Sequence, residues 1–169
     1  MIPTLPPLFR GTGSDMTLAL VQVATRKNPT IEIGAVDTSC IFVVCDLTQN
    51  DCPVVYVSDN FQDLTGYSRY EIVGQNCRLL QSPDGKVSAG TRRYFVANDA
   101  VYRLKTAVSE GREIQQSLIN YRKGGMPFLN LVTMIPIPWN NTDGSFRYCV
   151  GFLTNLVDCP DFTATGLIW

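Results

Sequence analysis

Five short stretches of the chain have the composition and alternation of β-strands. Residues 40–46 and 54–57 are rich in β-branched and apolar side chains, and the polar sequence 49–53 between them predicts the turn of a hairpin. Three further strands are predicted in the last third of the chain, at 112–122, 127–137 and 145–153, with turn sequences at 124–125 and 140–144.

Helical patterns lie between these two groups of strands. Three short helices, separated by glycines, are predicted at 59–65, 69–73 and 77–80. A longer helix is predicted at 96–109, because Leu104 and its apolar neighbours have helical spacing and Gly111 follows the end. Two strands, a group of helices and then three strands indicate an α+β fold.

The beginning of the chain has a different character from this core. Its first residues are rich in proline and glycine, which favours an irregular arm. Asp15 is expected to cap a helix at 16–25. Leu18 and Val21 would form the apolar face of that helix, and an extended segment is expected at 31–35. We therefore divide the chain into an N-terminal arm and cap (1–36), a core domain (37–155) and a C-terminal tail (156–169).

Composition and charge exclude several classes of function. The 14 Lys and Arg residues and the 15 Asp and Glu residues give a net charge of -1, so we expect no direct binding of nucleic acid. The chain has no histidine, which removes histidine-based acid–base pairs and histidine-ligated metals, and no metal site is predicted. The apolar runs are much shorter than the roughly 18 residues of a membrane helix, so no membrane partner is expected.

The cysteines and the N-terminal sequence bear on the cellular compartment. The six cysteines form no CxxC pair or other compact cluster, which is typical of reduced thiols. The apolar stretch 18–24 has its positive charges, Arg26 and Lys27, behind it rather than in front, unlike a secretory leader. We therefore expect a soluble intracellular protein of the cytoplasm or the nucleus.

A first group of chemically capable residues lies at 74–81. Asn76 is expected to cap the short helix that follows it. Cys77 and Gln81 are four residues apart and would then share a helix face, with Arg78 beside them. The positive end of the helix would favour the thiolate of the cysteine. The alternative is a buried cysteine with a packing role, which is the commoner situation for a single cysteine.

A second group consists of Asn120 and Asn130. A three-residue loop at 124–126 would pair Lys123 with Pro127, which places the two asparagines directly opposite each other, about 5 Å apart on one face of the sheet. Because their neighbours are apolar, the two amides need hydrogen-bond partners. They bind either each other or the edge of a ring with alternating acceptors and donors, such as the pyrimidine end of a flavin.

Together the two groups resemble the light-oxygen-voltage family, a branch of the PAS fold, over about residues 37–153. The first group looks like the flavin-adduct motif of that family, and the second matches its ring-binding asparagines. The sequence 61–67 resembles the helix that precedes the motif. Residues 34–40 and 80–86 are similar to the small fungal receptors of the Vivid and Envoy type, and to Envoy in particular.

The resemblance implies a fold and a chemistry. The fold would be a five-stranded antiparallel sheet with short helices that enclose a flavin pocket, together with an N-terminal cap. The flavin would be bound non-covalently in the dark. Blue light would then lead the sulfur of Cys77 to bond reversibly to ring carbon C4a while N5 gains a proton. Such a protein has no substrate and no turnover, so it would not be an enzyme.

The resemblance also assigns further contacts to the flavin. Arg78 would pair with a phosphate, which suits its fork-shaped cation, and Lys105 occupies the place of a second phosphate-binding arginine. Gln81 and Asn76 would contact the ribityl chain or the ring. Where the family usually has a glutamine near N5 and O4, this chain has Leu153, which can neither donate nor accept a hydrogen bond. We therefore expect a weaker signal to the sheet.

Two features outside the motifs leave alternatives open. The loop between Leu80 and Val96 is longer than in plant members, and such a loop covers an adenine in fungal relatives, so either FAD or FMN is compatible with the sequence. Its Arg92 and Arg93 would otherwise belong to a solvated loop. Cys52 lies in the predicted hairpin turn and is expected to be exposed, as an incidental surface thiol or as a redox-active one.

Three classes of function follow. A blue-light photoreceptor would signal through its N-terminal cap or sheet to a regulatory protein partner, or through a light-dependent homodimer. A flavin-dependent redox sensor or thiol oxidoreductase would need an open substrate face and a proton relay, which is hard to build without histidine. A PAS module for some other small ligand would make Cys77 incidental.

Overall fold

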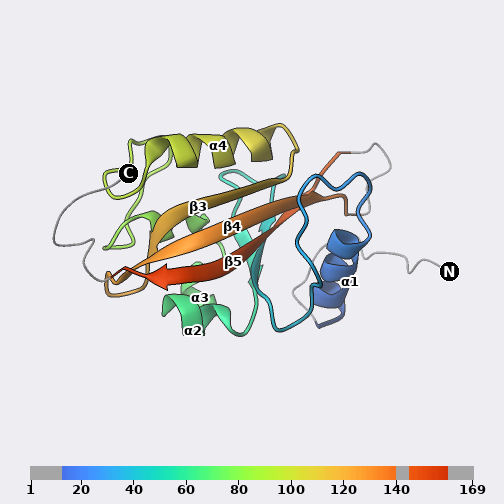
Figure 1. Ribbon diagram of the computed structural model, residues 1–169, viewed down its shortest axis with the longest axis horizontal. Helices are drawn as coiled ribbons and strands as arrows, with labels where there is room; N and C mark the ends of the chain where they lie inside the picture. The colour runs from blue at the N-terminus through green and yellow to red at the C-terminus, as the bar shows by residue number, and fades with distance from the viewer. Residues whose placement is uncertain (1–12, 140–144, 160–169) are drawn as a thin grey trace.

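Five antiparallel strands form a sheet with the order β2-β1-β5-β4-β3, in a computed structural model that describes residues 13–139 and 145–159 (Figure 1). The strands are β1 (Ile41–Asp46), β2 (Val54–Val57), β3 (Ile114–Tyr121), β4 (Pro127–Ile137) and β5 (Tyr148–Asp158). The helices are α1 (Gly13–Ala24), α2 (Phe61–Thr65), α3 (Arg69–Ile72), the 3₁₀ helix η1 (Cys77–Gln81) and α4 (Asn98–Ser109). The predicted α+β fold and five-stranded antiparallel sheet are confirmed. The predicted arm before residue 13, the turn at 140–144 and residues 160–169 of the tail lie outside the described residues.

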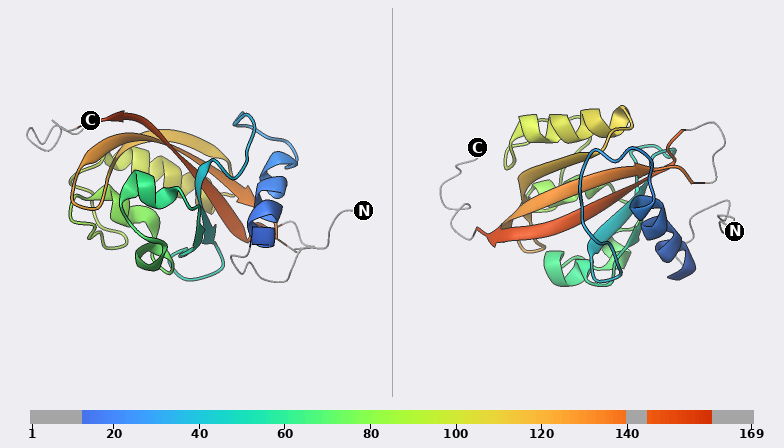
Figure 2. Two further views of the ribbon diagram at one scale, coloured as in Figure 1. Left: turned by 90° about the horizontal axis from the view of Figure 1, so that it is seen from below. Right: turned by 45° about the vertical axis from the view of Figure 1, so that its right-hand side comes forward.

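Both faces of the sheet are buried along β1 and the first part of β5, where the strands alternate between two sets of apolar side chains. In β1, Phe42 and Val44 belong to the cluster under α1, whereas Val43 and Cys45 belong to the cluster on the opposite face. The second face is covered by α2 beside β1, by α3 beside β2, and by η1 and α4 beside β3 (Figure 2). Helices from two sides therefore meet over this second face.

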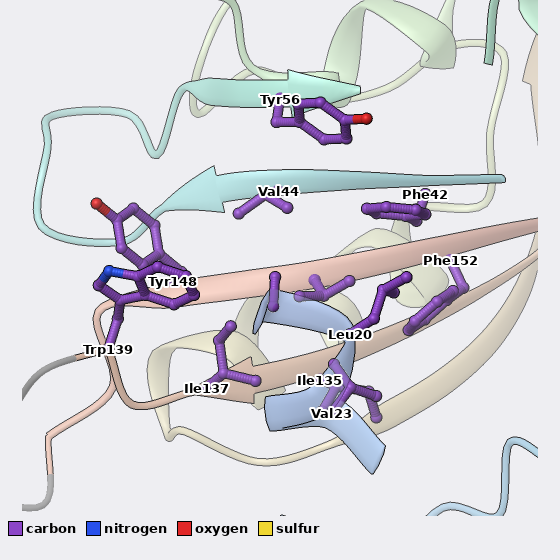
Figure 3. Packing of buried hydrophobic residues seen from close by; sticks show 12 residues of the cluster. Leu20, Val23, Phe42, Val44, Tyr56, Ile135, Ile137, Trp139, Tyr148 and Phe152 are labelled. Atoms are coloured by element: carbon purple, nitrogen blue, oxygen red, sulfur yellow. The ribbon is translucent and has the colours of Figure 1, made fainter. Parts of the chain in front are cut away.

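The helix α1 packs on the first face of the sheet through Ala19, Leu20 and Val23 (Figure 3). Burial of a large apolar side chain contributes about 1.5–3 kcal/mol, so this contact holds the cap on the sheet. The predicted apolar face was right for Leu18, which packs against this cluster, but wrong for Val21, which is 45% exposed. Apolar residues occur on several sides of this helix, so its sequence alone does not select the buried face. The helix also begins before Asp15, which is buried in the first turn instead of capping it.

Arg26 and Glu113 fasten the segment after α1 to the start of β3. Arg26 Nε binds one carboxylate oxygen of Glu113, and both side chains are almost fully buried. The other carboxylate oxygen accepts hydrogen bonds from the backbone N–H groups of Thr30 and Ile31, each at 2.9 Å. The predicted extended segment 31–35 forms no strand of the sheet, and side-chain groups of Glu113 and Arg26 bind the backbone of its first residue, Ile31.

The strand β5 continues beyond the end that the sequence predicted, at residue 153. Its last residues are exposed, so the alternation that marks a half-buried strand disappears. The strand continues nevertheless because its backbone pairs with β4, where Val157 is the partner of Leu129 and Asp158 is the partner of Phe128. The strand therefore crosses the domain boundary suggested between residues 155 and 156.

We expect Glu113→Gln to loosen the segment that follows α1. The amide leaves the buried Arg26 guanidinium without a compensating charge, which should lower the free energy of unfolding by about 3 kcal/mol. Urea denaturation and the rate of tryptic cleavage after Arg26 and Lys27 measure the effect. Glu110→Gln is the matched control, since it removes an exposed ion pair and should cost less than about 1 kcal/mol. An unchanged cleavage rate in Glu113→Gln would contradict this account.

The same contact has a defined pH dependence. Burial acts to raise the pKa of Glu113, but hydrogen bonds from Arg26, Ile31 and Thr30 outweigh it and lower the pKa below its ordinary value. A lowered carboxyl pKa stabilises the fold above the pKa of the unfolded chain, and this contribution is lost as pH falls through the lowered value. The stabilities of the wild type and of Glu113→Gln should therefore converge in acid.

Candidate functional site

A cavity of about 460 Å³ lies between the second face of the sheet and the helices η1 and α4. Its wall is mainly apolar with a few polar groups, as is usual for a small-molecule site. Every residue that the sequence assigned to the adduct or to flavin contacts lines this cavity: Asn76, Cys77, Arg78, Gln81, Lys105, Asn120, Asn130 and Leu153. The structure therefore brings the two groups of residues together, although they lie far apart in the chain.

The sequence around Cys77 folds locally as a capped 3₁₀ turn. Asn76 is the N-cap of η1, and its Oδ1 accepts a hydrogen bond from the backbone N–H of Arg78 at 2.9 Å, which confirms the predicted cap. The expected α-helical face shared by Cys77 and Gln81 is not formed, because a 3₁₀ helix aligns residues three apart rather than four. Both side chains line the cavity nonetheless.

Three further thiols, which the sequence analysis did not place in the site, line the same cavity: Cys45, Cys52 and Cys149. A hydrogen bond with the Cys77 thiol, together with burial, raises the pKa of Cys45 well above its ordinary value. Burial also raises the pKa of Cys149 to about 12. The two-residue period of a strand would have indicated that Cys45 faces the cavity, because Cys45 shares a sheet face with Val43, which also lines it.

Cys52 is half-buried rather than exposed, which corrects the prediction for this turn. Burial raises the pKa of its thiol, and the neighbouring Asp51 and Asp46 carboxylates raise it further. The thiolate is therefore disfavoured at neutral pH, which argues against a redox role for this residue. The residue faces the cavity because the turn folds back over the site.

Asn120 and Asn130 lie on the same face of the sheet but not directly opposite each other. The observed register pairs Asn120 with Phe128 and Tyr121 with Pro127. The backbone N–H of Arg122 donates to the carbonyl oxygen of Met126 at 2.8 Å, so the three-residue loop is 123–125 instead of the predicted 124–126. The backbone N–H of Lys123 donates to the carbonyl oxygen of Thr65 at 2.8 Å instead of pairing with Pro127. The two asparagines are therefore diagonal neighbours.

The two amides satisfy each other in part. Asn130 Nδ2 donates to Asn120 Oδ1 at 2.8 Å, and Asn130 Oδ1 accepts the backbone N–H of Thr154 at 3.1 Å. Both asparagines are almost fully buried. The two amides thus bind each other, as one of the two alternatives from the sequence predicted. Each amide still has hydrogen-bonding capacity left over, and both line the cavity.

Three cationic side chains line the cavity. They are Arg78, Arg93 and Lys105, and the carboxylate of Asp51 lines it as well. Arg93 Nε donates to Gln81 Oε1 at 2.6 Å. Burial lowers the pKa of Arg93, and the nearby Arg78 cation lowers it further. The cavity is therefore suited to an anionic group.

Leu153 and Gly151 present the cavity with apolar surface from β5. Leu153 is buried and belongs to the cluster around Cys77, so position 153 offers the cavity no hydrogen-bonding side chain. A Cβ atom at Gly151 would lie only 3.3 Å from Val43 Cγ2, so the glycine keeps this strand close to β1. The sequence analysis did not single out Gly151, whose role depends on the strand that lies beside it.

The fold and the cavity define a PAS domain. Residues 38–158 match the PAS domain family, and the chain belongs to that family. Within it, the chain belongs to the light-oxygen-voltage branch of the fungal blue-light receptors, as the similarities to known proteins show. The family that the sequence suggested is confirmed.

Both solved structures and curated sequences support this assignment. A structure of a Vivid variant has a TM-score of 0.77 at 43% identity, covering 80% of this chain and 96% of that one. The photo-excited blue-light photoreceptor Vivid has a TM-score of 0.79 at 41% identity, covering 83% and 95%. The White collar 1 protein of Neurospora crassa is 65% identical over 91% of this chain and 13% of its own length. The blue light receptor lreA of Aspergillus flavus is 53% identical over 91% and 18%. The chain thus spans less than a fifth of these two curated relatives.

We expect Asn130→Leu to destabilise the protein even without a ligand. The substitution leaves Asn120 Oδ1 and the backbone N–H of Thr154 without their partner, which should cost about 1–3 kcal/mol for each buried group left unpaired. Urea denaturation of the ligand-free chain measures the loss. The control is Asn155→Leu, at the exposed β5 residue that pairs with Asn130 in register. Equal stability of the two variants would show that the amide pair contributes little.

Proposed function

We propose that this chain is the light-sensing domain of a fungal light-responsive regulator and that Cys77 is its photoreactive residue. The observation that carries the proposal is the position of Cys77 in one cavity with Arg78 and the asparagine pair. The similarity to Vivid over nearly the whole of that structure supports it. A domain of this kind is sensory, and we propose that the chain itself catalyses no turnover.

The residues around the cavity fit a phosphate-bearing flavin. Arg78 Nε is a buried donor without a hydrogen-bond partner in the described part of the chain, and Arg93 and Lys105 add positive charge nearby. Asn120 and Asn130 offer amide groups between apolar neighbours, as the edge of a ring requires. When bound, a flavin absorbs blue light and offers a thiol an electrophilic ring carbon.

Cys77 supplies the sulfur nucleophile and the proton in this proposal. Of the other thiols, Cys45 touches Cys77 and is held protonated by that contact and by burial, and burial has the same effect on Cys149. Thiol–disulfide chemistry needs a thiolate, and neither of these two thiols is poised to form one at neutral pH. This arrangement disfavours a thiol oxidoreductase, which needs a second reactive thiol or a proton relay, and the chain has no histidine to serve as one.

We infer that the site accepts FAD as well as FMN. Arg93, Ala89 and Gly90 line the cavity, so this part of the long loop belongs to the site, whereas Arg92 is exposed and does not line it. A loop that forms part of the wall provides a surface for the additional nucleotide of FAD. The flavin would be held without a covalent bond in the dark, by the arginines and the amides.

We propose that light changes how α1 covers the sheet, and that a second copy of the chain or a regulatory protein partner binds in response. The covered face is strongly apolar, as the cluster in Figure 3 shows. A light-state dimer of Vivid is known. Direct partners of other kinds, nucleic acid or membrane, are not proposed, and no helix in the described part of the chain is long and apolar enough to cross a membrane. We propose the cytoplasm or the nucleus as its location.

We expect Cys77→Ala to retain its flavin but to lose the reversible bleaching of flavin absorbance under blue light. The substitution removes the sulfur nucleophile and leaves the arginines and amides in place. Absorption spectra before and after illumination, followed by recovery in darkness, are the measurement. Cys40→Ala is the control, because Cys40 is half-buried but does not line the cavity. A fully reversible bleach in Cys77→Ala would remove this residue from its proposed role.

We expect Leu153→Gln to strengthen the signal that reaches the sheet. A glutamine amide can donate to flavin O4, which should shift the dark absorption band to longer wavelength, and it can rotate when N5 becomes a donor. Leucine presents the same apolar surface to both states. The light-dependent change in hydrodynamic size, measured by size-exclusion chromatography, should therefore grow.

The double variant Cys77→Ala/Leu153→Gln separates the two effects of this substitution. It should keep the shifted dark band but show no light-dependent change in hydrodynamic size. Equal light-driven changes in the wild type and in the single variant Leu153→Gln would mean that the signal leaves the site by a route that bypasses β5.

A further inference from the structure

The end of the Arg78 side chain is held by a carboxylate from the β1–β2 turn. Arg78 Nη1 donates to Asp51 Oδ1 at 2.8 Å, and Arg78 Nη2 binds Asp51 Oδ2, so the contact uses both oxygens and both terminal nitrogens. The arginine side chain is only 11% exposed, whereas the aspartate is 45% exposed. Asp51 therefore binds the outer end of a guanidinium whose remainder is buried at the cavity.

The third nitrogen of the same guanidinium is unsatisfied. Arg78 Nε is buried and has no hydrogen-bond partner in the described part of the chain, although a guanidinium has donors on all three nitrogens. Buried donors in proteins are nearly always paired. Because Arg78 lines the cavity, a bound anion is the partner that would complete its hydrogen bonds.

The position of Asp51 is itself fixed by the turn. Asp51 has φ of 65° and Cys52 has φ of 45°, both in the left-handed region that few residues other than glycine, asparagine and aspartate adopt. Asn76 Nδ2 donates to the carbonyl oxygen of Asp51 at 2.7 Å. Asn76, which caps η1, thus also fixes the β1–β2 turn. Asp51 in that turn then holds Arg78, the residue after Cys77.

We propose that Asp51 is a positioning residue for the phosphate of the ligand: it holds both terminal nitrogens of Arg78, so that the guanidinium stays at the cavity wall, where a phosphate can bind it. The inference rests on the proposed function, because it assumes a phosphate-bearing flavin. A positioning role for Asp51 predicts the opposite of what its charge alone would predict. A carboxylate near an anionic ligand should repel it, so removing that carboxylate should tighten binding. Positioning requires the opposite result.

The test compares FMN with riboflavin, which has the same ring and ribityl chain but no phosphate. The full chain is freed of flavin, and each compound is titrated by the quenching of its fluorescence. We expect Asp51→Asn to weaken FMN binding about tenfold and to leave riboflavin binding unchanged. A neutral amide has only one acceptor oxygen, so it cannot accept hydrogen bonds from both terminal nitrogens of Arg78 as the carboxylate does. Asparagine tolerates the left-handed backbone, and the hydrogen bond from Asn76 goes to the main chain, so the turn is preserved.

Two further variants make the result specific. Asp63→Asn removes an exposed carboxylate that does not line the cavity, and it should bind FMN like the wild type. Arg78→Lys keeps the charge but removes Nε and the fork. If Asp51 acts through Arg78, adding Asp51→Asn to Arg78→Lys should change FMN affinity by less than about twofold, because coupled effects do not add. Should Asp51→Asn fail to fold by circular dichroism, Asp51→Gly replaces it, because glycine is free at positive φ.

Each outcome decides a separate point. Unchanged or tighter FMN binding in Asp51→Asn overturns the positioning role, as does an equal loss for riboflavin and FMN. Additive losses in the double variant also overturn it, since Asp51 would then act without Arg78. A wild-type chain that binds neither compound contradicts the proposed function itself, whereas a chain that binds both equally well contradicts only the role of the phosphate.

Discussion

The burial of both faces of the sheet along β1 and the first part of β5 is the constraint on which the rest of this structure depends. A sheet with one wet face would show polar residues at every second position, but β1 is apolar at Phe42 and Val44 as well as at Val43 and Cys45. Each face must then be covered by something else. One helix covers the first face, and helices approaching from two sides cover the second, so that a cavity remains between them.

The amides and the guanidinium at this cavity differ in how they are satisfied. The amides of Asn120 and Asn130 share a hydrogen bond, and Asn130 also binds the backbone of β5. These bonds tie three strands together. Arg78 is different, because one of its buried donors has no partner in the described part of the chain. A cation that lines the cavity and keeps an unpaired donor is suited to an anionic ligand.

Cys77 is one of several thiols at the cavity and differs from the others by its place in the capped turn η1. Cys45 and Cys149 occupy partner positions on β1 and β5 and line the same cavity. A hydrogen bond with Cys77, together with burial, raises the pKa of Cys45, and burial raises that of Cys149. Leu153 adds apolar surface from β5, so the sheet beside Cys77 offers the cavity no polar side chain at position 153.

The order of strands and helices along the chain and the cap of η1 followed from local periodicity and from adjacent residues. The assigned cavity residues followed from the resemblance of their motifs to a known family, whereas the other cavity thiols did not follow from the sequence. The sequence did not determine which face of α1 is buried, since Leu20 and Val21 are both apolar and only the sheet distinguishes them. Nor did it determine the register of the asparagines, because the tight loop forms one residue earlier than its turn sequence suggested. The contact of Asp51 with Arg78 joins a turn to a helix far along the chain. Tertiary structure decided these features because each one is a contact between segments whose separation the local sequence pattern does not encode.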